Sequence, residues 1–283
     1  MISPEEEEYI LDRAYVSEHI VSLMALISKG DPFFIEDHLG FAKDNWLIFV
    51  GYPLDQRFST ERSEKIIHQT LETFQPEILW FIGPEIPAFL LSTCQERETD
   101  QYYHLDLEKV KLKASLRRAV DQASQELTIE RGHLISKGHE ALISELLKRE
   151  KLPPRVRELY RAMPDYVSHS STACVLNAWD KKRKLCAFYV IELGAKHFST
   201  YVLGTYSKKH YVPHASDLLF LEMIKLSREQ MKNTIDLGLG VNQGIRRFKE
   251  KWGGVPSLPY EFCECTYSQK KRIPLIKILE GKL

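Results

Sequence analysis

Residues 211–254 read YVPHASDLLFLEMIKLSREQMKNTIDLGLGVNQGIRRFKEKWGG, and this stretch decides how the second half of the chain folds. The strongly apolar pattern over 216–231 predicts a largely buried helix, and Asp217 lies in its first turn, where the helix dipole favours an acid. A short strand over 234–237 follows, and then a second helix over 243–252. The glycines and proline of Gly-Gly-Val-Pro, at 253–256, end that helix.

The segments on either side extend this pattern. We expect a strand (127–132), two helices (138–149 and 154 to about 163) and three strands (172–179, 185–193 and 198–206) before it, and a last strand (260–267) after it. The charged turn at 180–184 makes the first two of the three strands a hairpin. The predicted order of the second half is therefore β-α-α-β-β-β-α-β-α-β.

The first half of the chain also alternates helices and strands. We expect helices over 6–26 and 60–74, strands over 46–52, 77–82 and 102–107, and a helix rich in Arg and Lys over 113–125. We therefore predict two lobes, 1–112 and 113–283. The expected fold class is α+β, with a mixed sheet flanked by helices.

Composition limits the classes of protein that fit. The chain has 283 residues with 39 Lys and Arg against 39 Asp and Glu, and this zero net charge counts against a dedicated nucleic-acid binder. No stretch approaches the ~20 apolar residues of a membrane helix, and no basic leader opens the chain. The odd count of five cysteines suits reduced thiols, so we expect a cytoplasmic location. Cys263 and Cys265 lack a second cysteine pair, so we expect no metal site.

The stretch 211–254 resembles the C-terminal half of the FemAB-like branch of the GCN5-related N-acetyltransferase (GNAT) superfamily. The matching residues are Ser216, Leu218, Leu219 and Glu222 on the helix, Asp236-Leu237-Gly238 at the strand end, and Gly244, Ile245, Phe248, Lys249 and Gly253 after it. The predicted element order extends the resemblance over the second half. The first lobe resembles, without a motif, the degenerate GNAT-like lobe of two-lobed members.

The resemblance implies acyl transfer to an amine or hydroxyl acceptor. In this fold two adjacent parallel strands, here 198–206 and 234–237, splay apart and free backbone groups that bind the acyl donor. The donor's phosphates would lie at the start of the next helix, where orphan N–H groups favour anions. The residues in that position here are Lys208, Lys209, His214, Ala215, Ser216 and Asp217.

Three alternatives for the activity follow from the same residues. The expected donor is an acyl-CoA, although the chain lacks the Gln/Arg-x-x-Gly-x-Gly/Ala loop of many acetyltransferases. FemAB-like enzymes that use aminoacyl-tRNA also lack that loop, so tRNA is the first rival donor. The second rival is a silent GNAT-like fold that binds a ligand or a partner. The sequence leaves open whether the chain forms a homodimer.

Four residues, with Glu222 as a further alternative, are candidates for the chemistry itself. Lys249 stands where many acetyltransferases carry a Tyr that protonates the departing thiolate, and a Lys could give a proton or hold an oxyanion. Its alternative is a solvated residue or a partner of Asp236. Glu192, near a strand end, is the expected general base, with Asp236 and Glu222 as alternatives. Tyr206 is expected to orient the substrate or to donate a proton.

Overall fold

The computed structural model describes residues 2–55 and 58–267. The strands are β1 (Asp31–Ile35), β2 (His38–Lys43), β3 (Trp46–Val50), β4 (Ile78–Gly83), β5 (Cys94–Asp106), β6 (Leu127–Gly132), β7 (Ala173–Asp180), β8 (Leu185–Glu192), β9 (Phe198–Tyr206), β10 (Thr234–Leu239) and β11 (Val255–Thr266). The helices are α1 (Pro4–Arg13), the 3₁₀ turn η1 (Ser17–His19), α2 (Val21–Ser28), α3 (Thr60–Phe74), α4 (Ala88–Leu91), α5 (Ala114–Glu126), α6 (Lys137–Arg149), α7 (Pro154–His169), α8 (Ala215–Glu229) and α9 (Gln243–Lys251).

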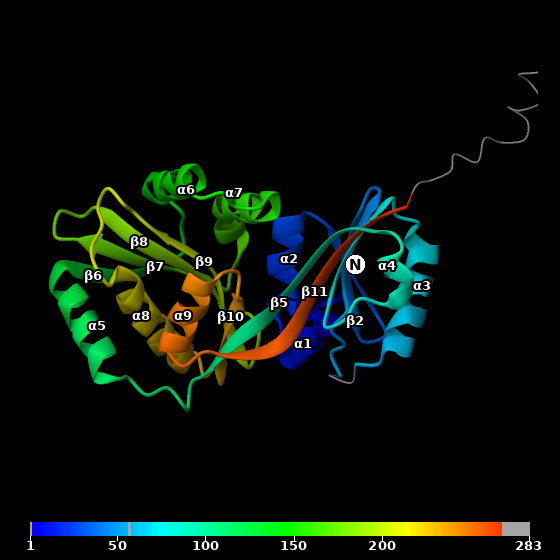
Figure 1. Cartoon of the computed structure of the whole chain (residues 1–283), viewed down its shortest axis with the longest axis horizontal. Coiled ribbons are helices and arrows are strands. Elements are labelled where there is room, and N and C mark those ends of the chain that lie inside the picture. The colour runs from blue at the N-terminus through cyan, green and yellow to red at the C-terminus, as the bar shows by residue number, and fades with distance from the viewer. Residues whose placement is uncertain (1, 56–57, 268–283) are drawn as a thin grey trace, which may run out of the picture.

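The described strands form one mixed sheet in the order β1-β2-β3-β4-β11-β5-β10-β9-β8-β7-β6, with helices on both faces (Figure 1). This confirms the expected α+β class with a mixed sheet flanked by helices. The predicted element order of the second half is also confirmed, from β6 through α6 and α7 to β11.

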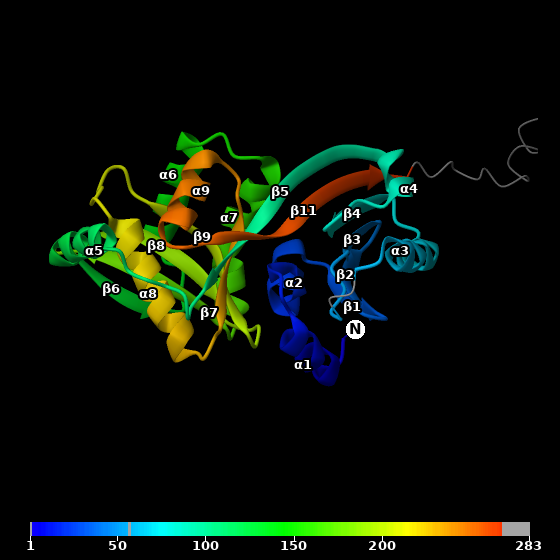
Figure 2. The same ribbon diagram turned by 60° about the horizontal axis from the view of Figure 1, so that its bottom comes forward.

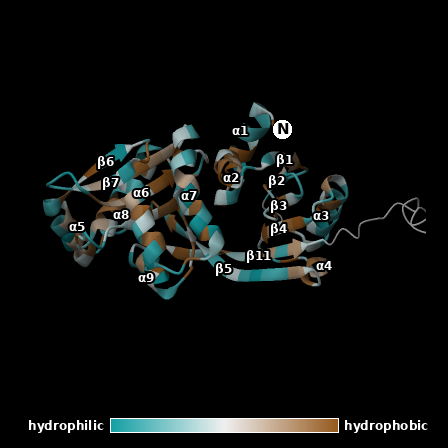
Figure 3. Ribbon diagram, turned by 90° about the horizontal axis from the view of Figure 1, so that it is seen from above, coloured by the Kyte–Doolittle hydropathy of each residue, from teal (hydrophilic) through white to brown (hydrophobic). Residues whose placement is uncertain are grey.

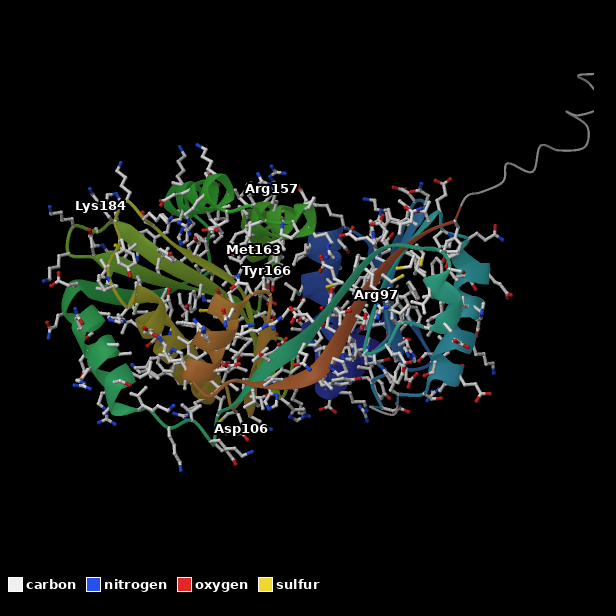
Figure 4. The ribbon with its side chains drawn as sticks, viewed as in Figure 1. Arg97, Asp106, Arg157, Met163, Tyr166 and Lys184 are labelled. Atoms are coloured by element: carbon white, nitrogen blue, oxygen red, sulfur yellow. The ribbon has the colours of Figure 1, made fainter. Side chains whose placement is uncertain are left out.

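The long strands β5 and β11 join the two halves of this sheet (Figures 1 and 2). β11 pairs with β4 over residues 261–266 and with β5 along most of its length, and β5 then pairs with β10. Figure 4 labels Arg97 and Asp106, which mark the two parts of β5. The last described strand, β11, thus lies between two strands of the first half, β4 and β5. The division into lobes 1–112 and 113–283 stays a prediction, and β11 crosses it.

Two strands begin well before their predicted starts. β5 begins at Cys94 instead of 102, and β11 begins at Val255 instead of 260. The first part of β5, CQERETDQ, is hydrophilic and mostly exposed, so it lacks the apolar alternation that marks a half-buried strand (Figure 3). Pairing with β11 holds it in place instead. The hairpin of β1 and β2 was also missed.

The helix expected over 6–26 is divided into α1, η1 and α2. His19 is fully buried at the break, and its Nε2 atom lies 2.9 Å from the carbonyl oxygen of Tyr52. Tyr15 secures the same bend, because its hydroxyl donates to the carbonyl oxygen of Pro53 at 2.9 Å. The bend brings residues 12–15 beside the starts of β9 and β10.

The second helix of the second half, α7, ends at His169 and not near 163 as predicted. Pro164 lies inside it and removes one backbone hydrogen bond. Met163 and Tyr166, labelled in Figure 4, are both fully buried and pack in the core beneath α7. Burial of such side chains contributes about 1.5–3 kcal/mol each, which offsets the lost bond.

Because side chains alternate along each strand, the sheet of the second half has two faces that pack against different helices. Ile235 and Leu237 of β10 pack in the core that includes α5 and α8. Strand neighbours point to opposite faces, so Asp236 between them faces the side that α6 and α7 cover. Asp236 is thus a polar residue on a face of the sheet that also packs an apolar core.

Candidate active site

The splay predicted for the two parallel strands is confirmed. β9 and β10 pair at only three positions, Thr234 with Phe198, Ile235 with Ser199 and Asp236 with Thr200. β9 continues to Tyr206 in pairing with β8, while β10 turns away into the loop before α9. The two strands therefore separate immediately after Asp236.

The open edge of β9 carries backbone groups that face away from β8. The N–H of Ser207 donates to Cys186 on β8, so by alternation the backbone groups of Gly204 and Tyr206 face the open side. The Tyr160 hydroxyl donates to the carbonyl oxygen of Gly204 at 3.0 Å, and Arg149 Nη1 donates to that of Tyr206 at 3.4 Å. α6 and α7 thus reach this edge.

A row of polar side chains crosses the sheet where the splay begins. Glu192 lies opposite Thr200, Thr200 opposite Asp236, and Asp236 opposite His104. Directly opposed residues share a face of the sheet, so these four side chains lie side by side. Thr200 Oγ1 and Asp236 Oδ2 are buried without a hydrogen-bond partner among the described residues. Buried polar atoms are normally paired, so both atoms are candidates for contact with a ligand.

Asp236 is the most constrained member of this row. It is 7% exposed, and its Oδ1 accepts a hydrogen bond from the N–H of Gly238 at 2.8 Å. Burial raises the pKa of the Asp236 carboxyl, against the opposing effects of the Gly238 N–H, the Lys249 ammonium and the nearby Ser17. A carboxylate with a raised pKa suits a general base.

A cavity of about 330 Å³ lies beside Asp236 where the two halves of the sheet meet. Its walls come from residues 12–15 at the end of α1, from Tyr102 and His104 on β5, from the starts of β9 and β10, and from 257–258 on β11. The sequence did not predict this contribution of the N-terminal segment. The bend at His19, which brings it here, depends on contacts between residues far apart in the chain.

Lys249 belongs to α9, and its ammonium group lies at the end of β10. Lys249 is 5% exposed, and its Nζ donates to the carbonyl oxygens of Gly238 at 3.0 Å and Leu239 at 2.6 Å. Burial lowers the pKa of Lys249 to about 8, although the charge of Asp236 opposes this shift. The residue is therefore a buried amine near the splay that can change protonation close to neutral pH.

The side chain of Glu192 is enclosed in the protein interior. It is fully buried, and its oxygens accept hydrogen bonds from the Tyr166 hydroxyl, the N–H of Gly194 at 2.6 Å and the Ser170 hydroxyl at 3.4 Å. It does not line the cavity described above. This geometry favours a structural role for Glu192 over the predicted role of general base. The alternative base, Glu222, pairs with Arg131 at 2.7 Å and Lys225 at 3.5 Å.

The start of α8 holds the residues predicted to bind phosphate. His214 precedes the helix in a left-handed conformation with φ of 64°, and no side chain caps the first turn that Ala215 and Ser216 begin. Asp217 is buried, and its Oδ1 accepts from Lys251 Nζ at 2.5 Å and Trp252 Nε1 at 3.0 Å. The negative charge of Asp217 is thus balanced internally by α9.

The loop before α8 presents two cations and an aromatic pair. Lys208 and Lys209 are exposed, and the loop is anchored where the N–H of Lys208 donates to Glu145 Oε1 at 2.6 Å. Tyr206 is half-buried, and its ring lies 5.8 Å from that of the exposed Tyr211. These side chains stand at the open end of β9, as the resemblance implied, and their role in binding a donor stays a prediction.

Comparison with solved structures identifies the fold. L-PGS from Bacillus licheniformis aligns with 100% of this chain and 97% of its own at 16% identity and a TM-score of 0.58. FemX aligns with 99% of both chains at 12% identity and a TM-score of 0.60. A tandem GNAT protein from the clavulanic acid biosynthesis pathway covers 81% of this chain and 78% of its own, at 12% identity and a TM-score of 0.52.

These likenesses show that the chain has a GNAT-like fold. No family model and no curated protein matches the chain. Among the described helices none has the length and apolarity that a membrane crossing requires. Within residues 2–55 and 58–267, no three or more His, Cys, Asp or Glu side chains are grouped to hold a metal ion.

Proposed function

We propose that this chain, which has the FemAB-like GNAT fold, transfers an acyl group from an acyl-CoA donor to an amine or hydroxyl acceptor. One observation carries the proposal: the splay of β9 and β10 and the cavity meet at one buried carboxylate, Asp236. A donor laid along the open edge of β9 and an acceptor in the cavity would approach that carboxylate from two directions. The transferase fold neighbours support the same class of reaction.

The donor would use backbone groups for its chain and the start of α8 for its phosphates. The amides of a pantetheine arm can bond to the outward groups of β9. The uncapped first turn of α8 leaves N–H groups that favour anions, and exposed Lys208 and Lys209 stand nearby. Because Lys251 and His214 pair with Asp217, that acid does not repel the phosphates.

Asp236 and Lys249 have separate proton-transfer roles in the proposed reaction. The acceptor attacks the thioester carbonyl carbon, its proton passes to the Asp236 carboxylate, and an outward N–H of β9 holds the oxyanion. The carbon–sulfur bond then breaks, and the leaving thiolate takes a proton from the Lys249 ammonium. Lys249 stands near enough to affect the pKa of Asp236. Tyr206 orients the donor at the open end of β9.

Thermal unfolding of the full chain with coenzyme A, acetyl-CoA, a long-chain acyl-CoA and bulk tRNA tests the donor class. A ligand at ~100 times its dissociation constant stabilises by about 2.7 kcal/mol. For a chain of this size that raises the midpoint by about 5 °C. We expect this rise with one acyl-CoA. Adenosine and an unrelated thioester serve as controls, and no shift with any coenzyme A compound would overturn the acyl-CoA proposal.

Aminoacyl-tRNA is the second candidate donor, and the similarity to FemX favours it. It would present an ester in place of the thioester at the same splay. A tRNA that binds through phosphates loses affinity steeply with salt, so its thermal shift would shrink between about 50 and 200 mM salt. A tRNA shift with that salt dependence, together with no coenzyme A shift, would replace the first candidate by the second.

A further inference from the structure

We propose that Cys94 and Cys265 are a redox-active pair of thiols that forms a reversible disulfide between β5 and β11. This site is separate from the proposed transfer. It lies beside α4, where the start of β5 meets the end of β11, whereas the cavity beside Asp236 contacts the opposite ends of these two strands (Figure 2).

Three thiols face the same side of the sheet at this point. Cys263 and Cys265 are two positions apart on β11, so their side chains point to one face, and their sulfur atoms lie 3.2 Å apart. Cys94 on β5 lies directly opposite Cys265, although the ladder skips Gln95 between this pair and the one before it. Opposed residues share a face of the sheet, so Cys94 belongs to the same group. We call Cys94, Cys263 and Cys265 the thiol cluster.

Backbone spacing favours a disulfide across the strands over one along β11. Directly opposed residues of antiparallel strands have Cα atoms about 4.5–5.5 Å apart, within the range of about 4.4–6.8 Å that disulfides span. Residues two positions apart on one strand have Cα atoms about 6.6 Å apart, near the upper limit of that range. Cys265 is therefore better placed to bond with Cys94, and its contact with Cys263 is a hydrogen bond.

The members of the thiol cluster differ in their access to solvent. Cys263 and Cys265 are fully buried beside the short helix α4, where Cys265 Sγ donates to the carbonyl oxygen of Leu90 at 3.6 Å. Cys94 is only half-buried. A small reagent in solvent can therefore reach Cys94 first, while Cys265 waits behind it as the second thiol.

Cys263 prepares Cys265 for attack. Its S–H group donates to Cys265, and this hydrogen bond lowers the pKa of the Cys265 thiol to about 7, against the effects of burial and of the Glu264 charge. The same hydrogen bond raises the pKa of Cys263, which stays a thiol. The thiolate is the form that attacks a disulfide, so Cys265 is the attacking group. Cys263 acts through Cys265 as a positioning residue.

The oxidant is a small disulfide, for which glutathione disulfide serves as the probe. Cys94 loses its proton to solvent, its thiolate attacks one sulfur of the probe, and the first glutathione leaves as a thiolate that takes up a proton. The Cys265 thiolate then attacks the Cys94 sulfur, the bond from Cys94 to glutathione breaks, and the second glutathione leaves in the same way. Two protein thiols are thus oxidised while one disulfide is reduced to two thiols, and excess reduced glutathione reverses both steps.

The test treats the reduced full chain with glutathione disulfide and counts its thiols after unfolding. We expect two of the five thiols to be lost, and digestion without reductant to yield a peptide that joins Cys94 to Cys265. The bond closes the long loop from 94 to 265, so oxidation should raise the unfolding midpoint by about 5 °C or more. Excess reduced glutathione should restore all five thiols and the original midpoint.

Single substitutions separate this site from general oxidation. Cys94→Ala should form no disulfide, and Cys265→Ala should stop with one glutathione bound to Cys94. Cys263→Ala should close the bond severalfold more slowly, and Cys263→Ser, which keeps a donor to Cys265, should restore the rate. The control variant Cys186→Ala, in the separate core of the second half, should behave as the wild type.

An unchanged thiol count, a disulfide that also forms in Cys94→Ala, or a glutathione that stays on Cys94 of the wild type would each overturn the inference. Equal closure rates in Cys263→Ala and the wild type would overturn the role of Cys263. Cys94→Ala changes only a half-buried side chain, so its unfolding midpoint under reducing conditions should match that of the wild type. That match distinguishes a missing disulfide from a loss of folding.

Discussion

Replacement of Asp236 by Asn should lower the rate of acyl transfer by about 10²–10⁴-fold, the range expected when a general base is lost. Asn keeps the size of the side chain and can still accept from the N–H of Gly238, so the strand end should stay intact. It cannot take a proton from the acceptor. The measurement is kcat and kcat/KM with the acyl donor that the thermal screen identifies.

The pH profile separates a base from a merely structural residue. Since the pKa of Asp236 is raised by burial, the wild-type rate should rise with pH as the carboxyl ionises. In Asp236→Asn this rise of the rate with pH should be absent. Asp106→Asn, at the C-terminal end of β5, is the matched control. It should keep both the rate of transfer and the fall of that rate at acidic pH. A variant at position 236 that keeps more than about half of the activity would exclude the base role.

Replacement of Lys249 by Met should lower transfer by about 10²-fold or more, as expected when one charged group near the transition state is removed. Stability should change in a pH-dependent way. Burial lowers the pKa of Lys249 to about 8, while a free lysine titrates near 10.4. Between these values the unfolded chain binds more protons, so wild-type stability should rise with pH, by up to about 3 kcal/mol.

Lys249→Met should lose this rise between pH 8 and 10, which urea unfolding at a series of pH values measures. Lys65→Met, at an exposed position of α3, is the control and should keep it. At pH 7 the Met variant should be about as stable as the wild type, because removal of a buried charge offsets the loss of two hydrogen bonds. A variant with full activity would show that Lys249 serves only to hold the end of β10.

The fold of the second half was predictable because its apolar periodicity is strong. The buried helix α8 and the three strands before it repeat their patterns over whole elements, and the resemblance that their order supports implied the splay. The hydrophilic start of β5 and the bend after α1 were not predictable in this way. Both depend on partners distant in the chain, β11 for the first and Tyr52 for the second.

Only the site residues that belong to the family motif could be predicted from the sequence. Asp236 and Lys249 stand at the splay as the resemblance implied, whereas Glu192 is enclosed by Tyr166 and Gly194. The pattern of a strand-end acid does not tell an enclosed carboxylate from an accessible one. Residues 12–15 had no such signal, because they reach the cavity beside Asp236 only through the fold of the N-terminal segment.

Hydrogen–deuterium exchange of the full chain with and without coenzyme A tests the central claim most directly. The account predicts slower exchange at the amides of 201–206, on the open edge of β9, and of 215–217, at the start of α8. The distant hairpin of β1 and β2, residues 31–43, should exchange as before. Unchanged exchange in both donor segments at a saturating concentration of coenzyme A would contradict the claim that the splay is a coenzyme A site.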